Sequence, residues 1–195
     1  MNEAERAKNS RFSLGLREVV GQELRLVPAA EGTSGMWSLD AGEISVARLR
    51  FGHDGWALDV ACKEEQWRLT KHRKFGWELS LERPDGTRLG SYHGGGWRAG
   101  GSIELTDGTR AKLRRSLLGN NWQIHDHHGA VGEIRSRAAN QLSPFGARPQ
   151  HRMTVTIDPE PAGSIGLHLV VLTACGVIML TDAIAAAATK TELGR

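Results

Sequence analysis

One apolar segment near the C-terminus constrains the fold more than any other part of the chain. From Ile165 to Thr181 the sequence reads IGLHLVVLTACGVIMLT, with no acidic residue, lysine or arginine. A helix that is apolar on every side has to be surrounded, either by the rest of the protein or by lipid. The remaining sequence therefore has to supply a protein wall for this segment, or the segment anchors the chain in a membrane.

The chain before this segment alternates between short strand-like stretches and turns that contain glycine. Pro84-Asp85-Gly86 and Asp107-Gly108 are typical of hairpin turns. We expect about a dozen strands, within residues 12–20, 23–28, 36–39, 43–51, 56–60, 67–70, 76–82, 87–92, 101–105, 109–117, 121–125, 130–135 and 153–157. This pattern predicts a mainly β fold built from consecutive hairpins.

Local signals give the boundaries of the parts. Residues 1–10 are polar and mixed in charge, so we expect a disordered tail without a signal peptide. Residues 11–195 are expected to form a single domain. Asp158-Pro159-Glu160-Pro161 ends the last strand, and Ser164 is a suitable N-cap, which places the helix at about residues 164–189.

A comparison of sizes favours protein over lipid around the helix. About twelve strands spaced about 4.8 Å apart and tilted by about 40° close into a barrel roughly 24 Å wide. A helix with its side chains is roughly 10–12 Å wide, which leaves room for one layer of inward side chains on each wall. We therefore predict a closed barrel of about twelve strands around one central hydrophobic C-terminal helix. Gly166, Ala174 and Gly176 would let bulky wall residues, such as the tryptophans, approach this helix.

The alternative is a C-terminal membrane anchor. About 17 residues without charge would span roughly 25 Å as a helix, slightly less than a hydrocarbon core of about 30 Å. Asp182 interrupts the run, and the sequence beside it lacks flanking aromatic residues and a strong basic cluster. The sequence leaves both arrangements open and favours the barrel.

Polar and reactive groups are also expected inside this fold. Cys62 and Cys175 are too few for a disulfide framework, which favours buried free thiols and a reducing compartment. His168 lies among aliphatic residues of the helix. We expect it to be a hydrogen-bonded buried histidine rather than a catalyst.

Four hairpins share one sequence form: a tryptophan or isoleucine, one residue, an aliphatic residue and then a turn with glycine. They read WSLDAGEI, WELSLERPDGTRL, IELTDGTRAKL and WQIHDHHGAVGEI. Together with the helix that ends in TACGVIMLTD, from Thr173 to Asp182, they resemble the tubby-like superfamily, which includes the phospholipid scramblases and the LURP-one-related proteins. The resemblance covers nearly the whole chain from about Arg11. It implies a twelve-stranded barrel around a central helix.

The resemblance and the charge indicate a binding role rather than an enzyme. The net charge of +3 and the pI near 9.1 suit an anionic partner. The resemblance implies a non-catalytic module that recognises anionic phospholipid head groups, located in the cytoplasm or peripherally at the inner face of the membrane. A protein partner stays open, whereas nucleic acid and cofactors are not expected.

Two groups of basic residues are candidates for contacting such head groups. They are Lys71, Arg73, Lys74, Arg110, Lys112 and Arg114. The last three alternate along one expected strand, so their side chains share a face. The first three belong with His72 to an expected loop. Either group could meet phosphate through charge-assisted hydrogen bonds.

A histidine cluster is the main candidate for other chemistry. His125, His127 and His128 surround Asp126, and together they could supply ligands for a metal such as zinc. Adjacent strand residues point to opposite faces, and the other hairpins have turns at this place, so an exposed turn is favoured over a metal site. A metal-dependent enzyme that uses these histidines is one alternative function.

The second alternative is a tail-anchored protein with a scramblase-like role. The chain has no Cys-rich palmitoylation segment and no Pro-rich N-terminal tail of the scramblase kind. The acidic stretch before the helix keeps only Asp158 and Glu160. An esterase is not expected, because the glycine loop after His93 has no accompanying nucleophile elbow.

Overall fold

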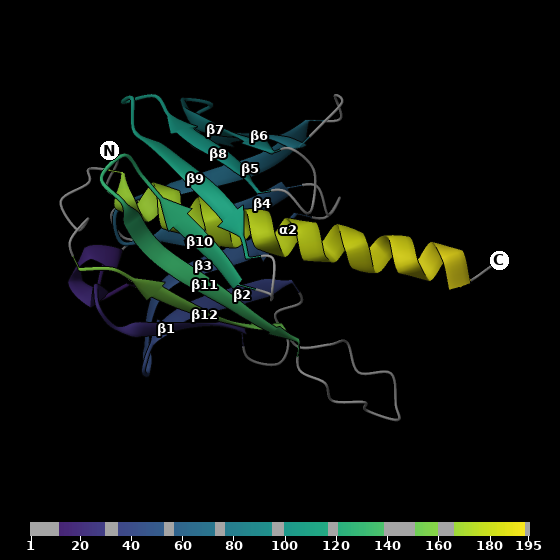
Figure 1. The fold of residues 1–195 in the computed structure, drawn as a ribbon, viewed down its shortest axis with the longest axis horizontal. Coiled ribbons are helices and arrows are strands. Elements are labelled where there is room, and N and C mark those ends of the chain that lie inside the picture. Colours follow the sequence, from purple (N-terminus) through teal and green to yellow (C-terminus); the bar gives the residue numbers. More distant parts are fainter. Residues whose placement is uncertain are drawn as a thin grey trace.

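The computed structural model describes residues 12–29, 35–52, 57–72, 77–94, 100–116, 121–138, 151–159 and 166–193. The disorder predicted for residues 1–10 lies outside these ranges. Within them the strands form one closed antiparallel barrel, in the order β1-β12-β11-β10-β9-β8-β7-β6-β5-β4-β3-β2. The helix α2 runs through this barrel (Figure 1).

The barrel is a succession of hairpins in which each strand pairs with its neighbours in sequence, and β1 closes the ring by pairing with β12. The strands are β1 (Glu23–Pro28), β2 (Met36–Ala41), β3 (Ile44–Phe51), β4 (Ala57–Cys62), β5 (Gln66–His72), β6 (Trp77–Glu82), β7 (Arg88–Gly94), β8 (Gly101–Leu105), β9 (Arg110–Arg115), β10 (Asn121–His125), β11 (Ala130–Ala138) and β12 (His151–Ile157). The predicted barrel is thereby confirmed, and the strands predicted from residue 23 onward agree to within a few residues.

The apolar part of the helix, from Leu167 to Thr181, is covered on every side by the barrel wall. α2 spans Leu167–Leu193, and every side chain from Leu167 to Thr181 is buried. The wall supplies the cover through period-two alternation: in β1, Leu24 and Leu26 are fully buried whereas their neighbours point outward. Protein, rather than lipid, therefore surrounds the apolar segment in this structure.

Small residues on the helix allow close contact with the wall, although with different partners from those predicted. A Cβ atom at Gly176 would collide with the ends of Leu58 and Leu69, and one at Gly166 would collide with Leu105. Bulky wall residues thus approach Gly166 and Gly176 as predicted, but the nearest of them are leucines and not tryptophans. The side chains of Leu58, Leu69 and Leu105 reach the helix backbone at these glycines and occupy the space that a Cβ atom would need.

The described tryptophans belong to the wall itself. Trp67 and Trp122 are buried, and Trp37 and Trp77 are partly buried and pack against the core. Trp67 meets the helix edge-on at the ring of His168, with the ring centroids 6.1 Å apart. Trp67 therefore packs at a place where the helix carries the ring of His168 instead of a small residue.

The strand predicted at residues 12–20 is wrong. Leu16–Val19 form a short 3-10 helix, η1, whose residues Leu16 and Val19 are fully buried and which packs against α2. In a 3-10 helix, residues three apart lie on one side, which brings both side chains to the core. Glu18 supplies the local cause, because its carboxylate accepts a hydrogen bond from the backbone N–H of Gly15.

The two ends of the helix differ in their surroundings. The N-terminal part lies among the strands, and the C-terminal part continues past them (Figure 1). In the part of the chain that the structure describes, no helix is both long enough and apolar enough to cross a membrane.

We predict that Gly176→Val lowers the free energy of unfolding by about 2 kcal/mol, because the added side chain overpacks the contact with Leu58 and Leu69. Urea-induced unfolding followed by tryptophan fluorescence measures this difference. An unchanged or increased stability would show that the wall does not contact the helix at this position.

Candidate functional site

A basic face lies on the outside of β9. Arg110, Lys112 and Arg114 are all exposed, and they alternate with the buried Ala111 and Leu113. The predicted shared face is therefore present. Successive outward residues of a strand are about 7 Å apart, so the three cations form a row of about 14 Å. We call these three residues the β9 basic face.

The neighbours of the β9 basic face leave most of its charge uncompensated. Arg110 lies 3.7 Å from the carboxylate of Glu104 on β8. Among the described residues, no carboxylate pairs with Lys112 or Arg114. In the strand register Lys112 stands between Ser102 and His125. An incoming anion would thus meet cations without first displacing a strong internal partner.

Lys71 is placed differently from the prediction. It lies within β5 rather than in a loop, in the same inward-facing register as Leu69, and its Nζ is 4.0 Å from the ring centroid of Trp77. Burial lowers the pKa of this lysine. The basic run from Lys71 to Lys74 looks like an exposed loop in the sequence. The sequence therefore did not show that β5 continues to His72.

The structure does not bring Lys71 onto the face of β9. Three strands, β6, β7 and β8, separate β5 from β9. Arg73 and Lys74 lie outside the described residues. Among the described residues of the predicted site, the β9 basic face is therefore the group that shares one face.

The histidine cluster forms the turn between β10 and β11. The carboxylate of Asp126 accepts hydrogen bonds from the backbone N–H groups of His128, at 2.7 Å, and Gly129, at 3.1 Å. His127 and His128 are exposed, with ring centroids 3.8 Å apart, and His125 faces Gln123 at 3.4 Å. Asp126 thus organises the turn, as expected for an exposed hairpin. The described residues contain no group of three or more His, Cys, Asp or Glu side chains arranged to hold a metal ion.

Ser91 and His93 form a pair that the sequence analysis missed. The Oγ of Ser91 lies 2.9 Å from Nε2 of His93, because residues two apart on β7 point the same way. Nucleophilic catalysis also needs a group that orients the base and donors for the oxyanion. Within the described ranges, no further side chain hydrogen-bonds to His93. The contact explains how Ser91 is satisfied and does not define an active site.

A partly buried polar cluster fixes the beginning of α2. Nε2 of His168 lies 2.9 Å from Oε1 of Glu65, and Arg83 donates to Oε2 of the same carboxylate at 3.0 Å. Burial by itself would raise the pKa of Glu65, but the hydrogen bonds from His168 and Arg83 outweigh it and hold this pKa below its usual value. His168 is thus a hydrogen-bonded buried histidine, as predicted. The cluster joins the helix to two turns of the barrel.

The cysteines lie in the core and are not bonded to each other. Cys62 and Cys175 are both fully buried free thiols. Burial raises the pKa of each thiol. The prediction of buried free thiols is confirmed, and neither group has the exposed, electropositive setting of a reactive cysteine.

Comparison of the chain with models of protein families, with curated proteins and with solved structures finds no match.

We predict that Glu65→Gln lowers the free energy of unfolding by about 2 kcal/mol at neutral pH, because hydrogen bonds to a charged carboxylate are lost. The folded-state pKa of Glu65 is below its usual value of 4.5. Its contribution is therefore complete above about pH 4.5 and disappears as the pH falls through the lowered pKa. Urea unfolding over a series of pH values measures both effects.

The control for this experiment is Glu23→Gln, whose carboxylate is mostly exposed and lies 3.5 Å from Arg25. This substitution should change stability by less than about 1 kcal/mol. A stability difference between Glu65→Gln and the parent that stays constant down to pH 3 would contradict the assignment of an ionised, hydrogen-bonded Glu65.

Proposed function

We propose that this protein is a non-catalytic binding module that recognises anionic phospholipid head groups at a membrane surface. The observation that carries the proposal is the β9 basic face, in which three exposed cations share one side of a strand. Of the three, only Arg110 pairs with a carboxylate of the described residues. Arginine and lysine bind phosphate through charge-assisted hydrogen bonds. The spacing of the row suits several head groups rather than one buried ligand.

The filled interior of the barrel supports contact from the outside. Wide barrels often enclose a ligand, whereas here α2 occupies the axis and its described side chains are buried against the wall. A ligand of the outer surface does not compete with this packing. The wall is also a rigid support for β9, because β8 and β10 pair with it on both sides.

The resemblance to the tubby-like superfamily supports the same proposal. The architecture it implies, a twelve-stranded barrel around a central helix, is the architecture of this chain. We propose membership of this superfamily, near the scramblase and LURP-one-related branch, and a position at the inner face of the membrane. The inner leaflet is rich in anionic lipid, and each Lys or Arg near such a surface contributes about 1 kcal/mol.

The structure supports the two alternative functions, a scramblase-like anchor and a metal enzyme, less well than the binding module. A scramblase-like anchor would require Leu167–Thr181 to leave the barrel, which would expose the inward faces of all twelve strands. A metal enzyme would require Asp126 to give up the hydrogen bonds that form its turn. No observation of the described residues favours either alternative over the binding module.

We predict that the double substitution Arg110→Glu and Arg114→Glu weakens binding to anionic vesicles at least about tenfold, because two attractive charges become repulsive. Co-sedimentation with phosphatidylcholine vesicles that contain phosphatidylserine measures the binding. Raising the salt concentration should weaken binding of the parent protein, since exposed charges are screened.

The matched control is Arg25→Glu with Arg135→Glu, which changes the net charge equally. These two arginines are exposed on β1 and β11, and each lies near a glutamate, at 3.5 Å and 2.9 Å respectively. Binding by the control should resemble that of the parent. Equal loss in both double variants would reduce the effect to net charge, and failure of the parent to bind anionic vesicles would refute the proposal.

A further inference from the structure

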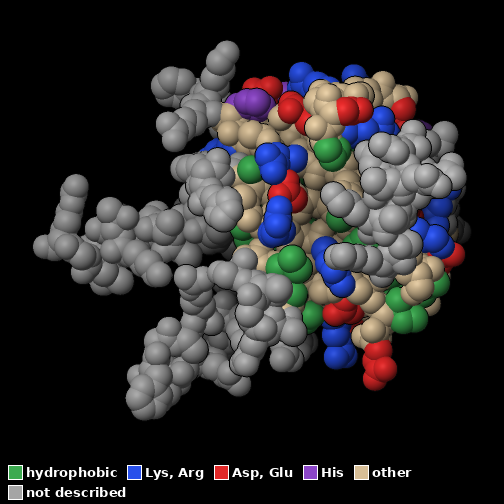
Figure 2. All heavy atoms as spheres, turned by 180° about the vertical axis from the view of Figure 1, so that it is seen from behind, with side chains coloured by type: hydrophobic (Ala, Val, Ile, Leu, Met, Phe, Trp, Pro, Cys, Tyr) green, Lys and Arg blue, Asp and Glu red, His purple; other side chains and the backbone are tan. Residues whose placement is uncertain are grey.

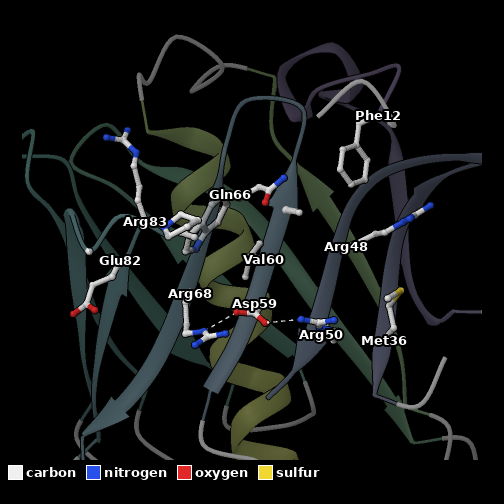
Figure 3. A pocket seen from close by; sticks show the side chains of 14 residues that line it. Phe12, Met36, Arg48, Arg50, Asp59, Val60, Gln66, Arg68, Glu82 and Arg83 are labelled. Carbon is white, nitrogen blue, oxygen red and sulfur yellow. Dashed lines mark hydrogen bonds and ion pairs between the residues drawn. The ribbon is translucent and has the colours of Figure 1, made fainter. Parts of the chain in front are cut away.

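A recess lies on the outer surface of β3 to β6, on a different side of the barrel from β9. Its volume is about 680 Å³, within the range of about 300–1,000 Å³ typical of small-molecule sites. Figure 2 shows the molecule from behind the view of Figure 1, with basic and acidic side chains interspersed over its surface. Figure 3 shows the side chains that line the recess. We call it the Ala61 recess, after the small residue among its lining.

The hollow arises where a short side chain stands between two long ones. In the strand register Ala61 on β4 is paired with Arg48 on β3 and with Gln66 on β5. All three point outward, because their neighbours on each strand are buried. The methyl group of Ala61 leaves unfilled the space that a longer side chain would occupy.

One edge of the Ala61 recess is a fixed ion-pair row. Asp59 accepts from Arg50 at 3.3 Å and from Arg68 at 2.6 Å, across three neighbouring strands (Figure 3). Burial by itself would raise the pKa of Asp59, but the hydrogen bonds from Arg68 and Arg50 outweigh it and hold this pKa below its usual value. Asp59 is therefore ionised and occupied, so the edge is rigid and internally compensated.

Arg48 is the cation of the recess that has no such compensation. Its guanidinium carbon lies 5.8 Å from the ring centroid of Phe12, at the outer range of a cation–π contact. Such a contact uses none of the five N–H donors of the guanidinium group, so they can bind an acceptor. Among the described residues, no carboxylate pairs with Arg48. The remaining arginine of the lining, Arg83, donates to Glu65.

We infer that the Ala61 recess binds a small organic anion with a planar apolar body. Four arginines and two acidic residues line it, so its charge is positive. Arg48 supplies a fork of donors for a phosphate or carboxylate group. The half-buried side chain of Met36 and the exposed ring of Pro84 offer apolar contacts for the rest of the ligand. The site is separate from the β9 basic face and does not depend on it.

Isothermal titration calorimetry with phenyl phosphate and benzoate as probes tests this inference. We expect saturable binding of at least one of them with a Kd below about 1 mM, and weaker binding of inorganic phosphate, which lacks the planar body. Arg48→Gln should weaken the binding of this probe about tenfold, through loss of the charged donor. Ala61→Leu should abolish it by filling the floor.

Two controls separate the recess from other effects. Thr156→Leu places a leucine side chain at an exposed, outward position of β12, away from the recess, and should leave probe binding unchanged. Binding of Arg48→Gln to anionic vesicles should equal that of the parent, which distinguishes a soluble ligand from a lipid head group. The inference is overturned if no probe binds saturably, or if binding survives both Arg48→Gln and Ala61→Leu. Equal loss of probe binding and vesicle binding in Arg48→Gln would instead assign the recess to lipid and overturn the soluble ligand.

Discussion

The apolar surface of α2 needs cover on every side, and this requirement determines the rest of the structure. A closed ring of twelve strands provides that cover, because its wall leaves a space of about one helix diameter. The wall and the helix therefore depend on each other. A barrel of this size without its helix would be hollow, and the helix without the barrel would expose its apolar side chains to water. Gly176 beside Leu58 and Leu69 shows how closely the two surfaces meet, and His168 with Glu65 fixes where the helix begins.

Because α2 fills the interior of the barrel, both proposed binding sites lie on its outer surface. There the strands present two arrangements of arginine and lysine that differ in kind. On β9 the cations are exposed and lie in an open row, which suits a broad anionic surface. Between β3 and β6 the charges are mostly paired, whereas Arg48 lines the Ala61 recess and pairs with no carboxylate of the described residues. The same barrel thus carries an open row of cations on one side and a recess of molecular size on another.

Much of the architecture could be predicted from the sequence, because strand alternation and an all-apolar helix are local patterns. Arg110, Lys112 and Arg114 could be placed on one face for the same reason. The 3-10 helix at Leu16–Val19 was missed, since Phe12, Leu14 and Leu16 alternate with smaller residues as in a strand. The helix there is accompanied by the contact between Glu18 and Gly15. The Ala61 recess depends on register across four strands, and His168 meets a carboxylate 103 residues away in the chain. Neither relation can be predicted from a short stretch of sequence, because each joins residues that are far apart in the chain.

The exposure of Cys175 tests the central claim most directly, because this thiol lies at the middle of the enclosed helix and is fully buried. In a Cys62→Ala variant, Cys175 is the single remaining thiol. A water-soluble thiol reagent applied to the native protein without detergent should leave it unmodified, and should modify it once urea unfolds the barrel. Rapid modification of Cys175 in the native protein would show that the strands do not enclose the helix.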